Sequence, residues 1–102
     1  MNSLEDQRQQ IDEVNQELLK ALLKRCLIVR DIFQKKAQNQ RPFYDPDREQ
    51  QMWQTILQEW ESWEEEQKNA LPKDFVIDFF STVFKGSLSY LKKEYHKSER
   101  LR

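Results

Sequence analysis

A long, uninterrupted helical pattern opens the chain. Between Leu4 and about Gln38 there is no Gly or Pro, and apolar residues recur at the spacings of one helix face. These residues are Ile11, Val14, Leu18, Leu22, Val29 and Ile32. The pattern predicts one helix of about 50 Å, which overhangs a compact protein of this length, about 33 Å across. We therefore expect a second copy, related by a two-fold axis, to cover the overhanging stripe in a homodimer.

A second helix is predicted after the loop that contains Pro42. Asp45, Pro46 and Asp47 are typical of a helix start, with an N-cap residue, a proline in the first helical position and an acidic first turn. We expect this helix to run to about Lys68. Its inward face carries Met52, Trp53, Ile56, Trp60 and Trp63.

A third helix is predicted after Leu71 and Pro72, where the helical pattern is broken. Its apolar face ends at about Leu91. That face carries Phe75, Val76, Phe79, Phe80, Val83, Phe84, Ser87, Leu88 and Leu91. Gly86 lies inside it and costs about 1 kcal/mol of helix propensity relative to Ala. We expect residues 92–102, which are mostly charged, to fray into a tail.

Composition agrees with an all-α class. The 102 residues include one Gly and three Pro, and 34% are charged. We expect residues 1–102 to form a single three-helix domain, with a core from about 4 to 91. The net charge of -1 gives no overall excess of basic residues, which disfavours nucleic-acid binding.

No cofactor, metal or membrane segment is expected. The single Cys26 lies among leucines, which is typical of a core thiol, and the single His96 has no partner for a metal set. The first residues lack the basic and apolar regions of a secretory signal, and no apolar run is long enough to cross a membrane. We therefore expect a cytoplasmic protein.

Two cations lie within the apolar stripe of the first helix. At 100° per residue, Arg25 and Lys36 fall within about 60° of Ile11 and lie three turns apart on one face. Burying an isolated charge costs several kcal/mol, so something negative is expected between them. Arg8 lies about 100° from Arg25 and would serve another surface, where it could reach the interior of a partner.

Further polar residues fall on faces that packing should bury. Glu49 shares the face of Trp53, Asp45 and Arg48 flank it, and Ser87 lies within the aromatic face of the third helix. Such a cluster could line a site for a small anion inside a helix bundle. Alternatively, Arg25, Lys36 and Glu49 form an internal ion-pair network that binds nothing. Helix geometry alone leaves both interpretations open.

The order of these residues resembles the all-helical (type II) class of chorismate mutases. The resemblance covers about residues 4–91 and depends on the string from Leu4 to Leu19, Arg25, Lys36 and the segment 45–49. It implies an intertwined homodimer of three-helix subunits, in which an arginine from one subunit completes the active site of the other. It also implies a Claisen rearrangement of the dianion chorismate to prephenate, without proton transfer, metal or cofactor.

The resemblance assigns a role to each matching residue. Arg8 matches the arginine that crosses between subunits, Arg25 a second carboxylate-binding arginine, and Lys36 the lysine on the substrate's ether oxygen and a carboxylate. Asp45, Arg48 and Glu49 match the D-x-x-R-E element, whose glutamate receives the ring hydroxyl, and Ser87 matches a serine beside a carboxylate. These positions are the expected catalytic and substrate-binding residues.

Leu91 departs from the pattern of that class. Its members place Gln or Glu there as a second donor to the ether oxygen, and neither Tyr90 nor Lys92 reaches that position without a rotation of about 100°. Losing such a donor costs about 2.7 to 4 kcal/mol in comparable sites. Three hypotheses follow: a chorismate mutase, an enzyme that releases pyruvate from isochorismate, and a non-catalytic module that binds such ligands or regulates a partner.

Overall fold

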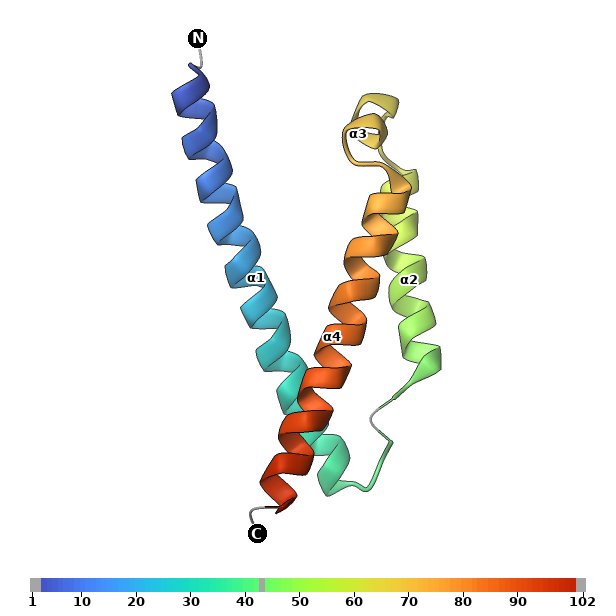
Figure 1. Ribbon diagram of the computed structural model, residues 1–102. Helices are drawn as coiled ribbons and strands as arrows, with labels where there is room; N and C mark the ends of the chain where they lie inside the picture. Colours follow the sequence, from blue (N-terminus) through green and yellow to red (C-terminus); the bar gives the residue numbers. More distant parts are fainter. Residues whose placement is uncertain (1–2, 43, 101–102) are drawn as a thin grey trace. The chain divides into compact units, whose positions relative to one another are not determined.

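The chain is helical in every regular element that its structure describes. The computed structural model covers residues 3–42 and 44–100, with the backbone alone for residues 90–100. The described helices are α1 (Leu4–Gln38), α2 (Pro46–Glu61), α3 (Glu65–Ala70) and α4 (Lys73–Arg100) (Figure 1). None of the described residues lies in a strand, so the all-α prediction is confirmed. Contacts divide the chain into two compact units, Met1–Lys35 and Lys36–Arg102, which are described separately below.

The first unit consists almost entirely of α1. Its start is capped by Ser3, whose Oγ accepts a hydrogen bond from the Asp6 backbone N–H at 3.1 Å. The predicted apolar stripe is largely open to solvent: Ile11 is 60% exposed and Leu18 is 55% exposed. Cys26, expected in the core, is half-buried. A single helix cannot bury its own apolar face, so this stripe requires a covering surface.

α1 ends in a Schellman motif, in which carbonyls of the last turn are satisfied by the backbone that follows. The Arg41 N–H donates to the Lys36 carbonyl at 2.8 Å, and the Gln40 N–H donates to the Ala37 carbonyl at 3.2 Å. Gln40 takes the left-handed conformation, with φ 57°. Glycine is the usual residue at such a position, and its replacement by Gln here involves some backbone strain.

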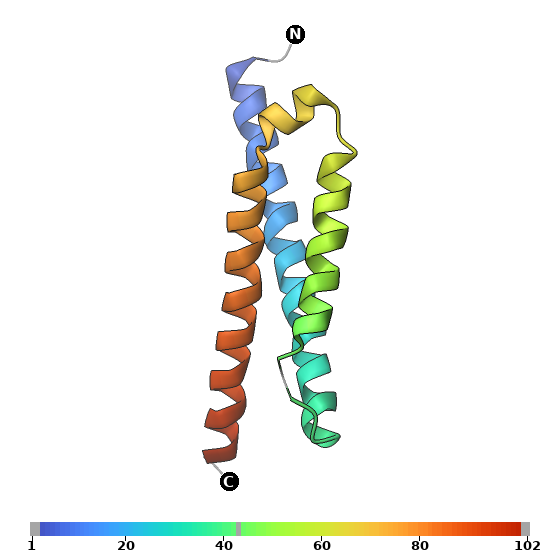
Figure 2. The ribbon, with the colours of Figure 1, turned by 90° about the vertical axis from the view of Figure 1, so that its right-hand side faces the viewer.

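The second unit is built on an antiparallel pair formed by α2 and α4 (Figure 2). The Trp53 and Phe84 rings meet edge to face, with centroids 5.2 Å apart, and Phe80 lies 6.0 Å from Phe84. Val76 is 6% exposed, which places it in the core. The apolar faces predicted for the second and third helices therefore pack against each other, as their periodicity implies.

The prediction of one continuous helix from 46 to 68 is wrong at residues 62–64, where the helix is broken. α2 ends at Glu61, and the separate short helix α3 follows, so the chain has four helices among its described residues. The Ser62 hydroxyl donates to the Glu59 carbonyl at 2.6 Å, and the Glu64 N–H donates to the Gln67 side chain at 3.1 Å. Local side-chain bonds of this kind compete with the helical backbone pattern, and they explain the break.

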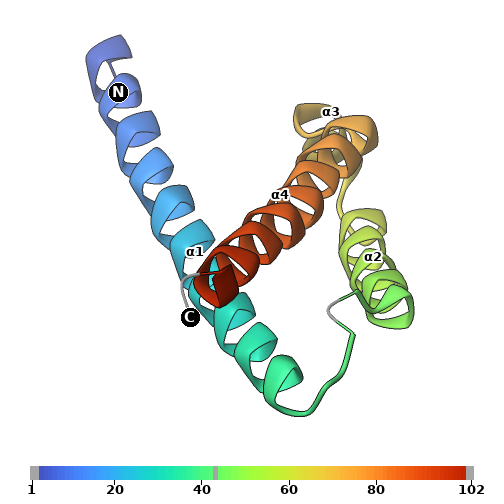
Figure 3. The ribbon, with the colours of Figure 1, turned by 60° about the horizontal axis from the view of Figure 1, so that its bottom comes forward.

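The predicted frayed tail is also wrong for the backbone that the structure describes. α4 continues to Arg100, well past Leu91 (Figure 3). After Gly86 the helix contains no Gly or Pro, and it is rich in Lys, Glu and Leu, which favour helix formation. Gly86 itself has open space around it, because a Cβ added there would meet nothing within 4 Å.

Candidate functional site

The cations of α1 differ in burial. Arg8 is exposed and forms a loose ion pair with Glu5, with 4.0 Å between nitrogen and oxygen. Arg25 and Lys36 are both half-buried. Because α1 is continuous between them, the helical rise separates them by about 16 Å on one face. Both therefore lie on the face of α1 that carries the apolar stripe, and each is less exposed than Arg8.

The first turn of α2 positions the predicted site residues Asp45, Arg48 and Glu49. Asp45 is the N-cap, and its Oδ1 accepts a hydrogen bond from the Arg48 backbone N–H at 3.1 Å. Pro46 occupies the first turn, and the Glu49 N–H donates to the Asp45 carbonyl at 3.0 Å. The predicted cap is confirmed. It holds Asp45, Arg48 and Glu49 in one turn, where Arg48 is exposed and Glu49 is half-buried.

Glu49 and Ser87 are brought to the same end of the α2–α4 pair. Glu49 lies one turn before Trp53 on α2, and Ser87 lies about one turn after Phe84 on α4. Because the two helices are antiparallel and the Trp53 and Phe84 rings are in contact, both positions extend beyond that contact in one direction. Ser87 is half-buried. The second unit thus brings Glu49 and Ser87 to one end of the α2–α4 pair.

The remaining predicted positions are placed as follows. Arg8 and Arg25 belong to the first unit and Lys36 to the beginning of the second. The backbone of Leu91 lies in α4, and its side chain is outside the described residues. No group of His, Cys, Asp and Glu among the described residues could hold a metal ion.

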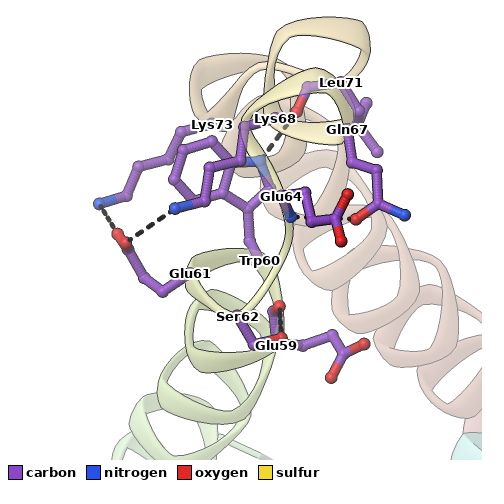
Figure 4. Close-up of polar contacts among 9 residues, drawn as sticks. All are labelled: Glu59, Trp60, Glu61, Ser62, Glu64, Gln67, Lys68, Leu71 and Lys73. Atoms are coloured by element: carbon purple, nitrogen blue, oxygen red, sulfur yellow. Dashed lines mark hydrogen bonds and ion pairs between the residues drawn. The ribbon is translucent and has the colours of Figure 1, made fainter.

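A polar cluster around Trp60 was not anticipated from the sequence (Figure 4). The Trp60 indole N–H donates to the Leu71 carbonyl at 2.8 Å. The ammonium groups of Lys68 and Lys73 lie 5.0 and 5.7 Å from the Trp60 ring centroid. Both also pair with the Glu61 carboxylate, at 3.7 and 3.3 Å. The cluster fastens α3 and the start of α4 onto the end of α2.

An open apolar cavity of 470 Å³ lies beside this cluster, at the α3 end of the α2–α4 pair. Its lining is Thr55, Ile56, Glu59, Trp60, Trp63, Leu71, Val76 and Phe80. The helical spacing of Trp60 and Trp63 predicted a core or interface role for them, and both are half-buried. The sequence carried no signal for the cavity, because the cavity depends on the break that follows Glu61. Its nearest lining residue on α2, Thr55, lies six residues after Glu49, so the cavity does not include Glu49.

No helix in the described part of the chain has the length and apolar character needed to cross a membrane. The elements that the structure describes are those of a small all-helical protein. A sequence model of the family "Chorismate mutase type II" matches residues 7–92. The chain belongs to this family. Searches of curated proteins and of solved structures each found no match.

Proposed function

We propose that this protein is a chorismate mutase that rearranges chorismate to prephenate. One observation carries the proposal: the region that matches the family contains every charged position expected in its site. These positions are Arg8, Arg25, Lys36, Asp45, Arg48 and Glu49. The half-burial of Arg25, Lys36 and Glu49 supports it, because charged groups rarely leave water without a charged partner or ligand.

The guanidinium groups of Arg8 and Arg25 bind and orient chorismate. Chorismate carries two carboxylates, and each can accept two parallel hydrogen bonds from an arginine. With Arg8 and Arg25 on the two carboxylates, the enolpyruvyl arm is held over the ring in a reactive conformation. In this proposal, the Glu49 carboxylate accepts a hydrogen bond from the ring hydroxyl of chorismate. Asp45 and Arg48 shape that end of the pocket, and Ser87 lies beside one of the substrate's carboxylates.

Lys36 supplies the electrostatic part of catalysis. The rearrangement breaks a C–O bond and forms a C–C bond in one step, so no proton has to move. Negative charge grows on the ether oxygen as the bond breaks, and a fixed ammonium group stabilises that charge more than the ground state. The Lys36 backbone is anchored at the end of α1 by the hydrogen bond from Arg41.

We propose that the working form is a homodimer in which Arg8 enters the site of the other copy. The length of α1 supports this arrangement. Its 35 residues span about 52 Å, and its apolar stripe is largely exposed, with Ile11 60% and Leu18 55% exposed. A second copy supplies another helix of equal length that can cover this stripe.

Leu91 favours two alternative functions. An apolar side chain in place of an amide or carboxyl donor removes one stabilising contact to the ether oxygen and leaves the carboxylate-binding residues intact. The same residues could therefore bind isochorismate and promote loss of pyruvate. They could also bind a chorismate-like dianion without turnover, as part of a regulatory module.

The deciding experiment follows chorismate and isochorismate with the purified chain. Loss of chorismate absorbance with formation of prephenate supports the mutase, pyruvate from isochorismate supports the second function, and binding heat without turnover supports the third. Lys36→Met is expected to lower the mutase rate at least about 100-fold. Lys20→Met removes an exposed lysine from the same helix and should leave the rate unchanged. Equal rates for both variants would refute the role of Lys36.

A second variant tests the effect of Leu91. Leu91→Gln restores an amide donor at this position, and we expect it to raise kcat about ten-fold or more, because one preorganised donor contributes 10²- to 10³-fold in comparable sites. Leu91→Met is the control, since it changes the shape of the side chain without adding a donor. A rise in kcat for Met, or none for Gln, would contradict the proposed geometry.

A further inference from the structure

The end of α1 brings a further cation next to Lys36. In the Schellman motif at this end, Lys36 is the first of six residues and Arg41 is the last. The Arg41 backbone N–H donates to the Lys36 carbonyl at 2.8 Å, and the left-handed conformation of Gln40, with φ 57°, allows this bond to form. Arg41 therefore lies beside the residue that the proposed function places on the ether oxygen of chorismate.

The side chains at these two positions are not those that usually accompany the motif. The first and last residues of a Schellman motif frequently make an apolar contact, because the motif brings them together. In this chain both residues are cations. Two positive charges held side by side repel one another, whereas a dianion bound near them is attracted by both. The choice of residues thus favours the binding of an anion over the packing of the turn.

Arg41 lies on the solvent side of the proposed site. It is exposed, whereas Lys36 is half-buried, and both belong to the second unit. Within the described part of the chain, no ion pair holds the Arg41 guanidinium. Arg41 also lies in the connection that leads from α1 to the cap of α2, and the four steps to Asp45 span at most about 14 Å. Arg41 is therefore close to both the lysine and the acidic turn of the site.

We propose that Arg41 is a further substrate-binding residue, whose guanidinium binds a carboxylate of the dianion as it enters beside Lys36. The planar guanidinium suits a carboxylate, which it can bind through two parallel hydrogen bonds. An exposed cation at the opening of a site also raises the rate at which an anion is captured. This role of Arg41 rests on the proposed function and extends it, because the family resemblance gives Arg41 no role.

A role in stability alone is the competing explanation. The C-terminal end of a helix carries a partial negative charge, so a cation close to it stabilises the helix. Arg41 follows Gln38, the last residue of α1, by three positions. Removal of a cation with this role alone would lower the stability of the protein and leave its affinity for substrate unchanged. Measurements of KM and of stability therefore distinguish the two roles.

Arg41→Gln in the full chain tests the proposal. The variant keeps the backbone N–H that donates to the Lys36 carbonyl, so the motif is retained. Binding that is equally strong in the ground state and the transition state changes KM and leaves kcat alone. We therefore expect KM for chorismate to rise at least about five-fold and kcat to stay within about two-fold. Arg41→Lys keeps the charge without the planar fork and should raise KM less.

Lys85→Gln is the matched control. Lys85 is an exposed cation of the same unit and lies about 160° around α4 from Ser87, so its loss changes the net charge equally but away from the site. Both kinetic constants should stay unchanged. Salt gives a second readout: the wild-type kcat/KM should fall as ionic strength rises, and it should fall less steeply in Arg41→Gln.

Three results would overturn the role of Arg41. These are a wild-type KM in Arg41→Gln, with or without a loss of stability in urea, an equal rise of KM in Lys85→Gln, and a salt dependence that Arg41→Gln leaves unchanged. If the wild type converts chorismate while Arg41→Gln does so with an unchanged KM, this role fails and the proposed function stands. If the chain binds chorismate or isochorismate without turnover, the calorimetric Kd replaces KM, and we expect the same five-fold rise. If it binds neither, both proposals fail together.

Discussion

The Trp60 indole offers a direct test of how α3 and α4 are attached to α2. Trp60→Phe keeps an aromatic ring and removes the N–H that donates to the Leu71 carbonyl at 2.8 Å. This bond joins residues eleven positions apart in a partly buried setting, and a carbonyl left without its donor there costs about 1 to 3 kcal/mol. The half-buried Lys68 and the exposed Lys73 would also lose part of their attraction to the ring, about 0.5 kcal/mol in all. We expect the free energy of unfolding to fall by about 2 kcal/mol.

Trp63→Phe is the matched control. Trp63 lines the same cavity and is also half-buried, but its indole N–H donates only to the exposed Glu59 carboxylate, at 3.3 Å. The loss of that bond should cost about 0.5 kcal/mol. Urea unfolding followed by circular dichroism compares the stability of the two variants. Both are measured at one protein concentration, because self-association would make the apparent stability depend on concentration. If Trp60→Phe destabilises the protein no more than Trp63→Phe, the Trp60–Leu71 bond does not attach these elements as argued.

Two further substitutions test single features of the helices. Asp45→Ala removes the side-chain acceptor that caps the Arg48 N–H, and it should lower the free energy of unfolding by about 1 kcal/mol. Asp45→Asn keeps an acceptor and should lower it much less. Thermal unfolding of both variants checks this, and equal losses of stability would rule out the cap. Gly86→Ala should raise the free energy of unfolding by about 1 kcal/mol in urea, because the site is helical and open. A loss of stability instead would mean that another chain approaches α4 at Gly86.

Much of the helical architecture could be predicted from the sequence, because its causes are local. The length of α1 follows from a stretch without Gly or Pro, and the start of α2 follows from the cap at Asp45 and the proline after it. The break after Glu61 could not be predicted by periodicity. It depends on the Ser62 hydroxyl competing for backbone carbonyls and on Trp60 bonding to Leu71 across the turn. The C-terminal end of α4 is helical despite its high charge, because Lys and Glu favour helices.

The sequence by itself determined which residue types stand at which helical positions: Arg25 and Lys36 on the apolar stripe, the acidic turn of residues 45–49, and leucine at position 91. Residue type and spacing need only the 3.6-residue period to be interpreted. Only the tertiary structure decided that Glu49 and Ser87 reach the same end of the second unit, since contact between α2 and α4 depends on aromatic packing between residues distant in the chain. It also decided that most of the α1 stripe is exposed, because the first unit consists almost entirely of α1 and a single helix cannot bury its own apolar face.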